Sequence, residues 1–207
     1  MFRLTLKKRI KKFYEETEDK YSDWISSILK NDKFDYMALS QNNNITWKVI
    51  EDNDDKIWLY FCLSRNENIT WENIKNNLDK DWVFEYLSYH PNITWDIIEN
   101  YANKNWEYQR LSINSNITWE NVKNNLDKDW NFDYLSYHPN ITWDIIKNNL
   151  IHPWNFKYVS QNPNVTWEII QNNTQFDWNI SNFSQNINLT WDIVKNNLDK
   201  DWDFISI

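Results

Sequence analysis

The sequence predicts an all-α fold, an α-solenoid built from 24-residue repeats that each contain two short helices. Three observations lead to this prediction. Fourteen of the fifteen tryptophans fall on two series with a constant step of 24 residues. Each copy carries residues that favour a helix start, and each copy carries residues that stop a helix. In such an array, a repeat buries its apolar face only against its neighbours.

The two tryptophan series are the predicted core. An indole buries a large apolar area, and its N–H can bond to a nearby carbonyl. We expect both series to be buried, and the tryptophan that follows threonine to be the more buried. The first ladder is Trp47, Trp71, Trp95, Trp119, Trp143, Trp167 and Trp191, and the second ladder is Trp58, Trp82, Trp106, Trp130, Trp154, Trp178 and Trp202.

The first helix of a repeat has a clear start signal, here described for residues 94–117. Thr94 is a favoured N-cap residue, Trp95 follows it, and Asp96 places a carboxylate in the positive first turn. Ile93 and Ile98 have the spacing of a hydrophobic staple. The sequence therefore predicts a short helix that begins at each first-ladder tryptophan.

The end of the first helix and the start of the second are predicted from asparagine and aspartate. The pair Asn76-Asn77 is expected to end the first helix, because asparagine tolerates left-handed geometry. Asp81 is expected to cap a second helix whose first residue is Trp82. That helix should end near Ser88, before a proline turn. Helices this short are marginal in isolation, and a second helix that is partly 3-10 fits the same spacing.

Two regions are predicted, an N-terminal segment (residues 1–33) and a single array (residues 34–207). Residues 21–24 are interpreted as a degenerate repeat start, so that the first region holds a capping repeat. The preceding residues have the spacing of a basic amphipathic helix, which either caps the first repeat or binds a partner. Its apolar positions are Phe2, Leu6, Ile10 and Phe13, and its basic positions are Arg3, Lys7, Lys8, Arg9, Lys11 and Lys12.

Charge and composition bound the partners and the compartment. Residues 13–207 carry 16 basic and 30 acidic side chains, a net charge of −14, so nucleic acid is an unfavourable partner. No apolar stretch is long enough for a signal peptide core or a membrane span. Cys62 is the only cysteine. We expect an intracellular protein that is not secreted, whose Asn-Ile-Thr triplets serve as turns and caps.

No catalytic, cofactor or metal site is predicted, so the protein is not expected to be an enzyme. His90 and His138 occupy equivalent places two repeats apart, too far from each other to share a metal. The chain has no glycine and thus no glycine-rich phosphate loop. Residues 69–100 and 117–148 are identical at 28 of 32 positions, a duplication that a catalytic site of unique residues would not tolerate.

The segment Leu-Ser-Tyr-His-Pro-Asn-Ile-Thr-Trp-Asp-Ile-Ile at residues 87–98 resembles a known repeat unit. Similar units occur in tryptophan-rich repeat proteins of giant DNA viruses of the mimivirus type. The period and turn are also similar to the leucine-rich variant repeat, which implies a right-handed superhelix of alternating α and 3-10 helices. The resemblance covers residues 34–207 and implies a viral origin, with a location in the host cytoplasm or the virion, but no activity. The turn proline is replaced at Asn43, Glu67, Ser115 and Ile187.

The function predicted from these features is a non-enzymatic scaffold that mediates protein–protein interaction. The alternatives are a structural virion component, or binding of carbohydrate or nucleic acid through exposed aromatic residues. The apolar C-terminal end, with Phe204 and Ile207, is a candidate for self-association as a homodimer. Columns that vary between repeats are the candidate partner surface: Val83, Glu85, Glu107, Gln109, Asn131, Asp133, Asn155 and Lys157.

Overall fold

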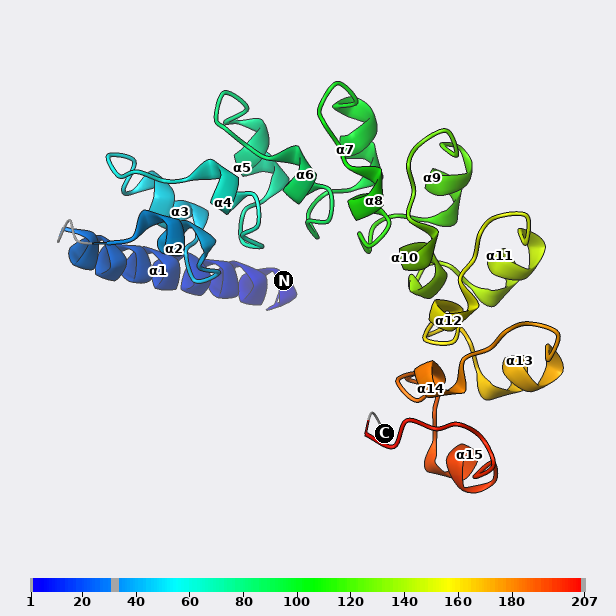
Figure 1. Cartoon of the computed structure of the whole chain (residues 1–207). Coiled ribbons are helices and arrows are strands. Elements are labelled where there is room, and N and C mark those ends of the chain that lie inside the picture. The colour runs from blue at the N-terminus through cyan, green and yellow to red at the C-terminus, as the bar shows by residue number, and fades with distance from the viewer. Residues whose placement is uncertain (1, 31–33, 206–207) are drawn as a thin grey trace. The chain divides into compact units, whose positions relative to one another are not determined.

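The structure is a computed structural model that describes residues 2–30 and 34–205, with the side chains of residues 2–11, 13 and 14 outside the description. It has fifteen helices and no strand in these ranges, which confirms the all-helical prediction (Figure 1). A long helix, α1 (Phe2–Leu29), comes first. First helices of the repeats are α3 (Trp47–Glu51), α5 (Trp71–Lys75), α7 (Trp95–Asn100), α9 (Trp119–Lys123), α11 (Trp143–Asn148), α13 (Trp167–Asn172) and α15 (Trp191–Lys195). Second helices are α2 (Tyr36–Gln41), α4 (Tyr60–Leu63), α6 (Phe84–Leu87), α8 (Tyr108–Leu111), α10 (Phe132–Tyr137), α12 (Phe156–Val159) and α14 (Ile180–Phe183).

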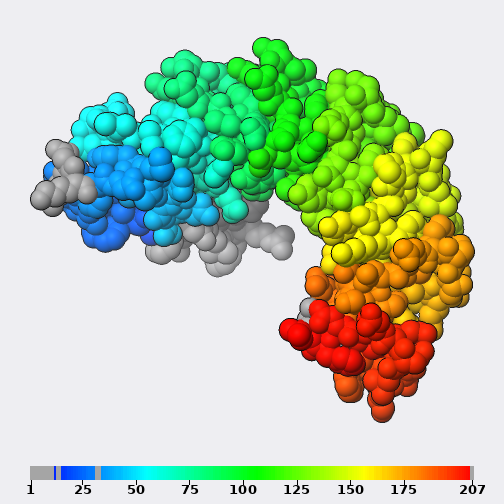
Figure 2. Space-filling view, viewed as in Figure 1, coloured from blue at the N-terminus to red at the C-terminus, as the bar shows by residue number. Residues whose placement is uncertain are grey.

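The chain divides into two compact units, residues 1–92 and residues 93–207. Within each unit the first helices follow one side of the stack and the second helices follow the other (Figure 1). The space-filling view shows the repeats of the second unit in direct contact along the chain (Figure 2). The predicted boundary after residue 33 lies inside the first unit.

The first helices begin as the sequence predicts. Each starts at a first-ladder tryptophan, with threonine at the N-cap. The Thr70 hydroxyl accepts a bond from the Asn73 amide, and the Asn73 side chain accepts one from the Thr70 amide, which forms a capping box. Ile93 and Ile98, the predicted staple, are both buried.

The predicted start of the second helix is wrong by two residues. Val83, not Asp81, is the N-cap of α6, and its backbone is extended at φ −101° and ψ 98°. Trp82 lies in the loop before the helix, where its indole N–H donates to the Asn77 carbonyl at 2.8 Å. The same bond recurs for every second-ladder tryptophan, from Trp58 to Asn53, Trp106 to Tyr101, Trp130 to Asn125, Trp154 to Asn149, Trp178 to Asn173 and Trp202 to Asn197. The indole therefore fixes the loop between the two helices.

The prediction that asparagines adopt left-handed geometry is also wrong, since no residue in the described part of the chain has a positive φ. Asn76 has helical angles of φ −77° and ψ −6°. The next residue, Asn77, folds its side chain back and donates to the Asn73 carbonyl at 2.9 Å. The helix end is thus closed by a side-chain bond. The second helices are α-helices, which is the first of the two forms that the spacing allows.

The core is aliphatic at its centre and aromatic at its edge. Ile69, Ile74 and Leu87 have no exposed surface. Six second-ladder tryptophans are buried, at 6–9% exposed, and Trp178 is half-buried. In the first ladder only Trp119 and Trp143 reach this level. The expectation that the first ladder is the more buried one is therefore wrong.

In the second unit the rings of the two ladders pack on each other. A first-ladder ring packs on the second-ladder ring 35 residues later, as Trp119 does on Trp154 with centroids 5.5 Å apart. Trp143 and Trp167 pack on Trp178 and Trp202 in the same way. Trp191, which was also predicted to be core, is 64% exposed.

Serine hydroxyls connect successive repeats at the ends of the second helices. The Ser136 Oγ donates to the Phe132 carbonyl at 2.6 Å and accepts from the Asn155 amide at 2.9 Å. Because Asn155 is the N-cap of the next second helix, one buried hydroxyl joins two repeats. The same pair of bonds is made by Ser64, Ser112, Ser160 and Ser184 within their units.

Buried asparagine and histidine side chains make the other connections between repeats. The Asn162 Nδ2 donates to the carbonyls of Ser136, His138 and Ile141, all in the preceding repeat, at 2.9–3.3 Å. The Asn162 Oδ1 accepts from the Asn164 amide at 2.8 Å. The column that bridges the repeats in this way, called here the bridging column, consists of Asn66, His90, Asn114, His138, Asn162 and Asn186.

A pair of alanine substitutions in one ladder tests the packing. Trp119→Ala should lower the free energy of unfolding by about 3–5 kcal/mol, because it empties a buried site. Trp191→Ala should cost less than about 1 kcal/mol, because that ring is mostly exposed. Urea unfolding followed by far-UV circular dichroism measures both. Equal losses in the two variants would contradict the packing described.

Candidate functional site

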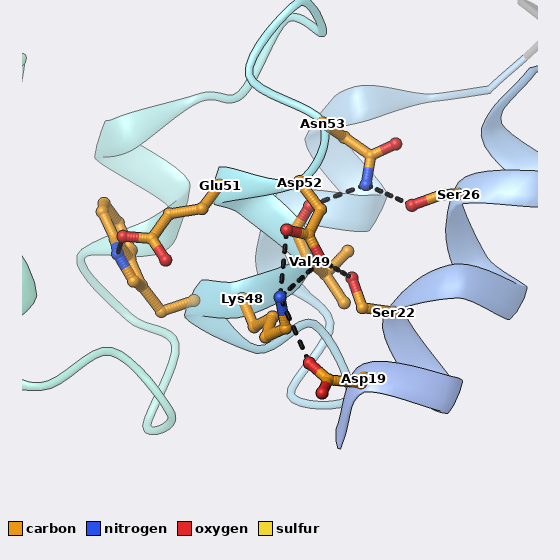
Figure 3. Close-up of polar contacts among 9 residues, drawn as sticks. Asp19, Ser22, Ser26, Lys48, Val49, Glu51, Asp52 and Asn53 are labelled. Carbon is orange, nitrogen blue, oxygen red and sulfur yellow. Dashed lines mark hydrogen bonds and ion pairs between the residues drawn. The ribbon is translucent and has the colours of Figure 1, made fainter. Parts of the chain in front are cut away.

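The second half of α1 is fixed to the first repeat by polar contacts (Figure 3). The Ser22 hydroxyl donates to the Asp52 carboxylate at 2.7 Å, and the Asn53 amide donates to Ser26 Oγ at 2.8 Å. Lys48 bridges the same two segments, with ion pairs to Asp52 at 3.0 Å and to Asp19 at 3.3 Å. These contacts join α1 to the end of α3.

The hydrogen bonds of this contact shift the pKa of both Asp52 and Lys48. The Ser22 hydroxyl and, to a smaller extent, Lys48 hold the pKa of the Asp52 carboxyl below its ordinary value. The hydrogen bonds that the Lys48 ammonium donates to Asp52 and Asp19 raise the pKa of Lys48. Ser22 is fully buried at the centre of the contact. This half of α1 covers the first repeat as a cap does.

Two further predictions concern the N-terminal segment, the degenerate repeat start and the apolar stripe. Residues 21–24 are no repeat start, because they lie in the middle of the continuous helix α1, and Trp24 is 59% exposed. The predicted apolar stripe of Phe2, Leu6, Ile10 and Phe13 lies outside the described side chains. Its role against a partner or the first repeat stays a prediction.

Each unit has a cavity at the same position of the repeat, and the two cavities are five repeats apart in the sequence. The first has a volume of about 430 Å³ and is lined by Trp47, Trp58 and Lys80, among others. The second has a volume of about 520 Å³, and its lining includes Trp167 and Trp178. Both linings contain one tryptophan from each ladder and no histidine or cysteine. They are recesses left where successive repeats meet.

All three histidines make contacts within the fold. His90 and His138 belong to the bridging column, and each Nε2 lies 3.0 Å from a carbonyl oxygen of the preceding repeat. Each Nδ1 accepts a backbone N–H, so the ring is neutral with its proton on Nε2. His152 stacks on Phe132 with centroids 5.4 Å apart. In residues 2–30 and 34–205, no group of three or more His, Cys, Asp or Glu side chains is placed to hold a metal ion.

The predicted partner surface separates into two kinds of position. Val83, Glu107, Asn131 and Asn155 are half-buried N-caps of second helices. Their variation is limited by this role, since Asn131 and Asn155 also accept bonds from their own helices. The other four positions, called here the outer column, are exposed: Glu85, Gln109, Asp133 and Lys157.

The C-terminal residues named for self-association are only partly described. Phe204 is 61% exposed and Ile205 is 99% exposed, whereas Trp202 is buried. Ile207 lies outside the described residues. A homodimer through this end stays a prediction.

One exposed aromatic cluster was not predicted from the sequence. Tyr134 and Tyr137, both from α10, have ring centroids 6.1 Å apart, and Tyr137 lies 5.8 Å from Tyr158 of α12. Burial, with smaller effects of the other two tyrosines, raises the pKa of Tyr137. The i, i+3 spacing on one helix and the position one repeat later were the signals available in the sequence.

Comparisons of the chain with protein-family models, with curated proteins and with solved structures find no match. The resemblance to viral tryptophan-rich repeats and the handedness of the superhelix therefore stay predictions. In the described part of the chain, no helix has both the length and the apolar character that crossing a bilayer requires.

The buried histidines predict a pH dependence of stability. Burial lowers the pKa of His90 and His138 below 6.5, although Glu67 near His90 and the bonded carbonyls act in the opposite direction. The unfolded chain then binds more protons than the folded chain as pH falls below 6.5, so stability present above that pH is lost. The slope approaches about 1.4 kcal/mol per pH unit for each histidine.

Asparagine at both positions removes the titrating groups and keeps the residue type that four other repeats use. The double variant His90→Asn, His138→Asn should lose less stability than wild type between pH 6.5 and pH 5, as measured by urea unfolding. Identical pH profiles for the two proteins would show that the rings are not held neutral.

Proposed function

We propose that the protein is a non-enzymatic repeat scaffold that binds a partner protein along the second-helix side of its repeats. The observation that carries the proposal is the contrast between buried columns, which hold only serine or only asparagine and histidine, and an exposed column whose residue type changes in each repeat. The serines at the ends of the second helices and the residues of the bridging column are buried and make hydrogen bonds within the stack. The outer column is exposed and holds glutamate, glutamine, aspartate and lysine in four successive repeats. Solenoids recognise partners with such columns.

The first-helix side is less suited to specific recognition. Its exposed first-turn acids, such as Glu72, Glu120 and Asp144, complement the helix N-termini and repeat with little change. Most tryptophans pack between repeats, and every second-ladder indole N–H is bonded to a backbone carbonyl. This use of the indoles argues against the carbohydrate or nucleic-acid alternative, which requires a ladder of exposed rings.

Selection from a random peptide library displayed on phage tests the proposal. The wild-type protein should enrich peptides whose binding is lost on charge reversal in the outer column, in the variant Asp133→Lys, Lys157→Glu. This variant keeps the net charge unchanged. The matched control is Glu120→Lys, Lys123→Glu, which makes the same exchange on the first-helix side and should keep binding.

Loss of binding in the control alone would place recognition on the first-helix side and contradict the proposal. Failure to enrich any peptide, together with binding to a glycan or oligonucleotide array, would favour the carbohydrate or nucleic-acid alternative.

A further inference from the structure

We propose that Tyr134, Tyr137 and Tyr158 bind an arginine side chain of the partner protein. This inference rests on the proposed function and names the chemistry that the second-helix side would recognise. The cluster belongs to two adjacent second helices, α10 and α12, which are in contact. Tyr134 is 38% exposed, and the other two rings are half-buried. Partly exposed tyrosines of this kind are typical anchors of protein interfaces.

The first unit contains an internal precedent for the contact. The Arg65 guanidinium lies over the ring of Tyr86, with Cζ 3.7 Å from the centroid. Tyr134 occupies the same repeat position as Tyr86, two repeats later. Two repeats after Arg65, the equivalent position is Ile113, which is 41% exposed. The repeat thus keeps the receiving ring but replaces the cation.

The arginine of the second unit forms an ion pair within its own repeat. Arg110 is the only arginine in residues 93–207, and its guanidinium is in an ion pair with Glu107. Lysines of the array stay farther from the rings they face, at 5.8 Å for Lys80 over Tyr60 and 5.9 Å for Lys128 over Tyr108. The planar guanidinium, which stacks on aromatic faces, is the group that makes the close contact.

The charge of the unit also favours a cationic partner. Residues 93–207 carry 8 basic and 14 acidic side chains, a net charge of −6. Asp133, next to Tyr134 on α10, is exposed and accepts a hydrogen bond from Asn155 at 2.8 Å. Lys157 is the cation nearest in sequence to Tyr158 and opposes this attraction. The acidic excess steers a basic segment to the unit, and the rings select arginine from it.

Two labelled peptides separate ring stacking from charge. A fluorescein-labelled peptide of alternating arginine and glycine should bind the wild-type protein about five to ten times more tightly than the lysine analogue of equal charge. Fluorescence anisotropy at physiological salt measures both affinities. Equal affinities would overturn the inference, because they would show attraction by charge alone.

Substitutions in the cluster assign the arginine preference to the rings. The double variant Tyr134→Leu, Tyr158→Leu should bind the two peptides equally, whereas Tyr134→Phe should keep the preference because the ring face remains. The control Phe61→Leu removes an exposed ring in the first unit and should leave the preference unchanged. A preference that survives in the double variant would overturn the inference.

A measurement on the wild-type protein removes any dependence on how the variants fold. In the NMR spectrum of the complex, the arginine side-chain protons should shift upfield, because they lie over aromatic faces. Absence of the shift at saturation would overturn the inference. Phage peptides that depend on the outer column but show no arginine preference would also overturn it while leaving the proposed function intact.

Discussion

The array depends on hydrogen bonds from buried side chains of one repeat to the backbone of the repeat before it. Helices of four to six residues are not stable alone, and their loops leave carbonyl groups that no helix satisfies. Asn162 donates to three such carbonyls, and Ser136 satisfies the cap amide of the next second helix. Because each bond needs two repeats, a repeat acquires its structure only when it is stacked on another.

These hydrogen bonds between repeats determine at which positions the sequence can vary. Bridging side chains and serine hydroxyls are buried and bonded, so a change there leaves a polar group without a partner. Outer-column residues such as Glu85 and Asp133 are exposed. Ile113 illustrates the same freedom, since its equivalent in the first unit is Arg65. Variation at the surface therefore costs little stability and can serve recognition.

Features that depend on local chemistry could be predicted from the sequence, and features that depend on a neighbouring repeat could not. Threonine caps and the Ile93–Ile98 staple involve residues a few positions apart, and the first helices begin where they indicate. Asp81 and Trp82 show a similar pattern, but the bond from the Trp82 indole to Asn77 keeps the chain extended. The ring that Trp119 packs on lies 35 residues later, and the tyrosine cluster needs two repeats. The contact of Ser22 with Asp52 joins residues 30 positions apart, and no local pattern indicated it.

The central claim is tested most directly at Asn162 by urea unfolding of the variants Asn162→Ala and Asn162→His. Alanine leaves carbonyls of the preceding repeat without a donor and should lower the free energy of unfolding by at least about 2 kcal/mol. Histidine occupies the equivalent position at residues 90 and 138 and should restore most of the loss at neutral pH. Asn148→Ala, at an exposed asparagine, should change stability by less than about 0.5 kcal/mol. An Asn162→Ala variant as stable as wild type would show that the bridging hydrogen bonds do not hold the repeats together.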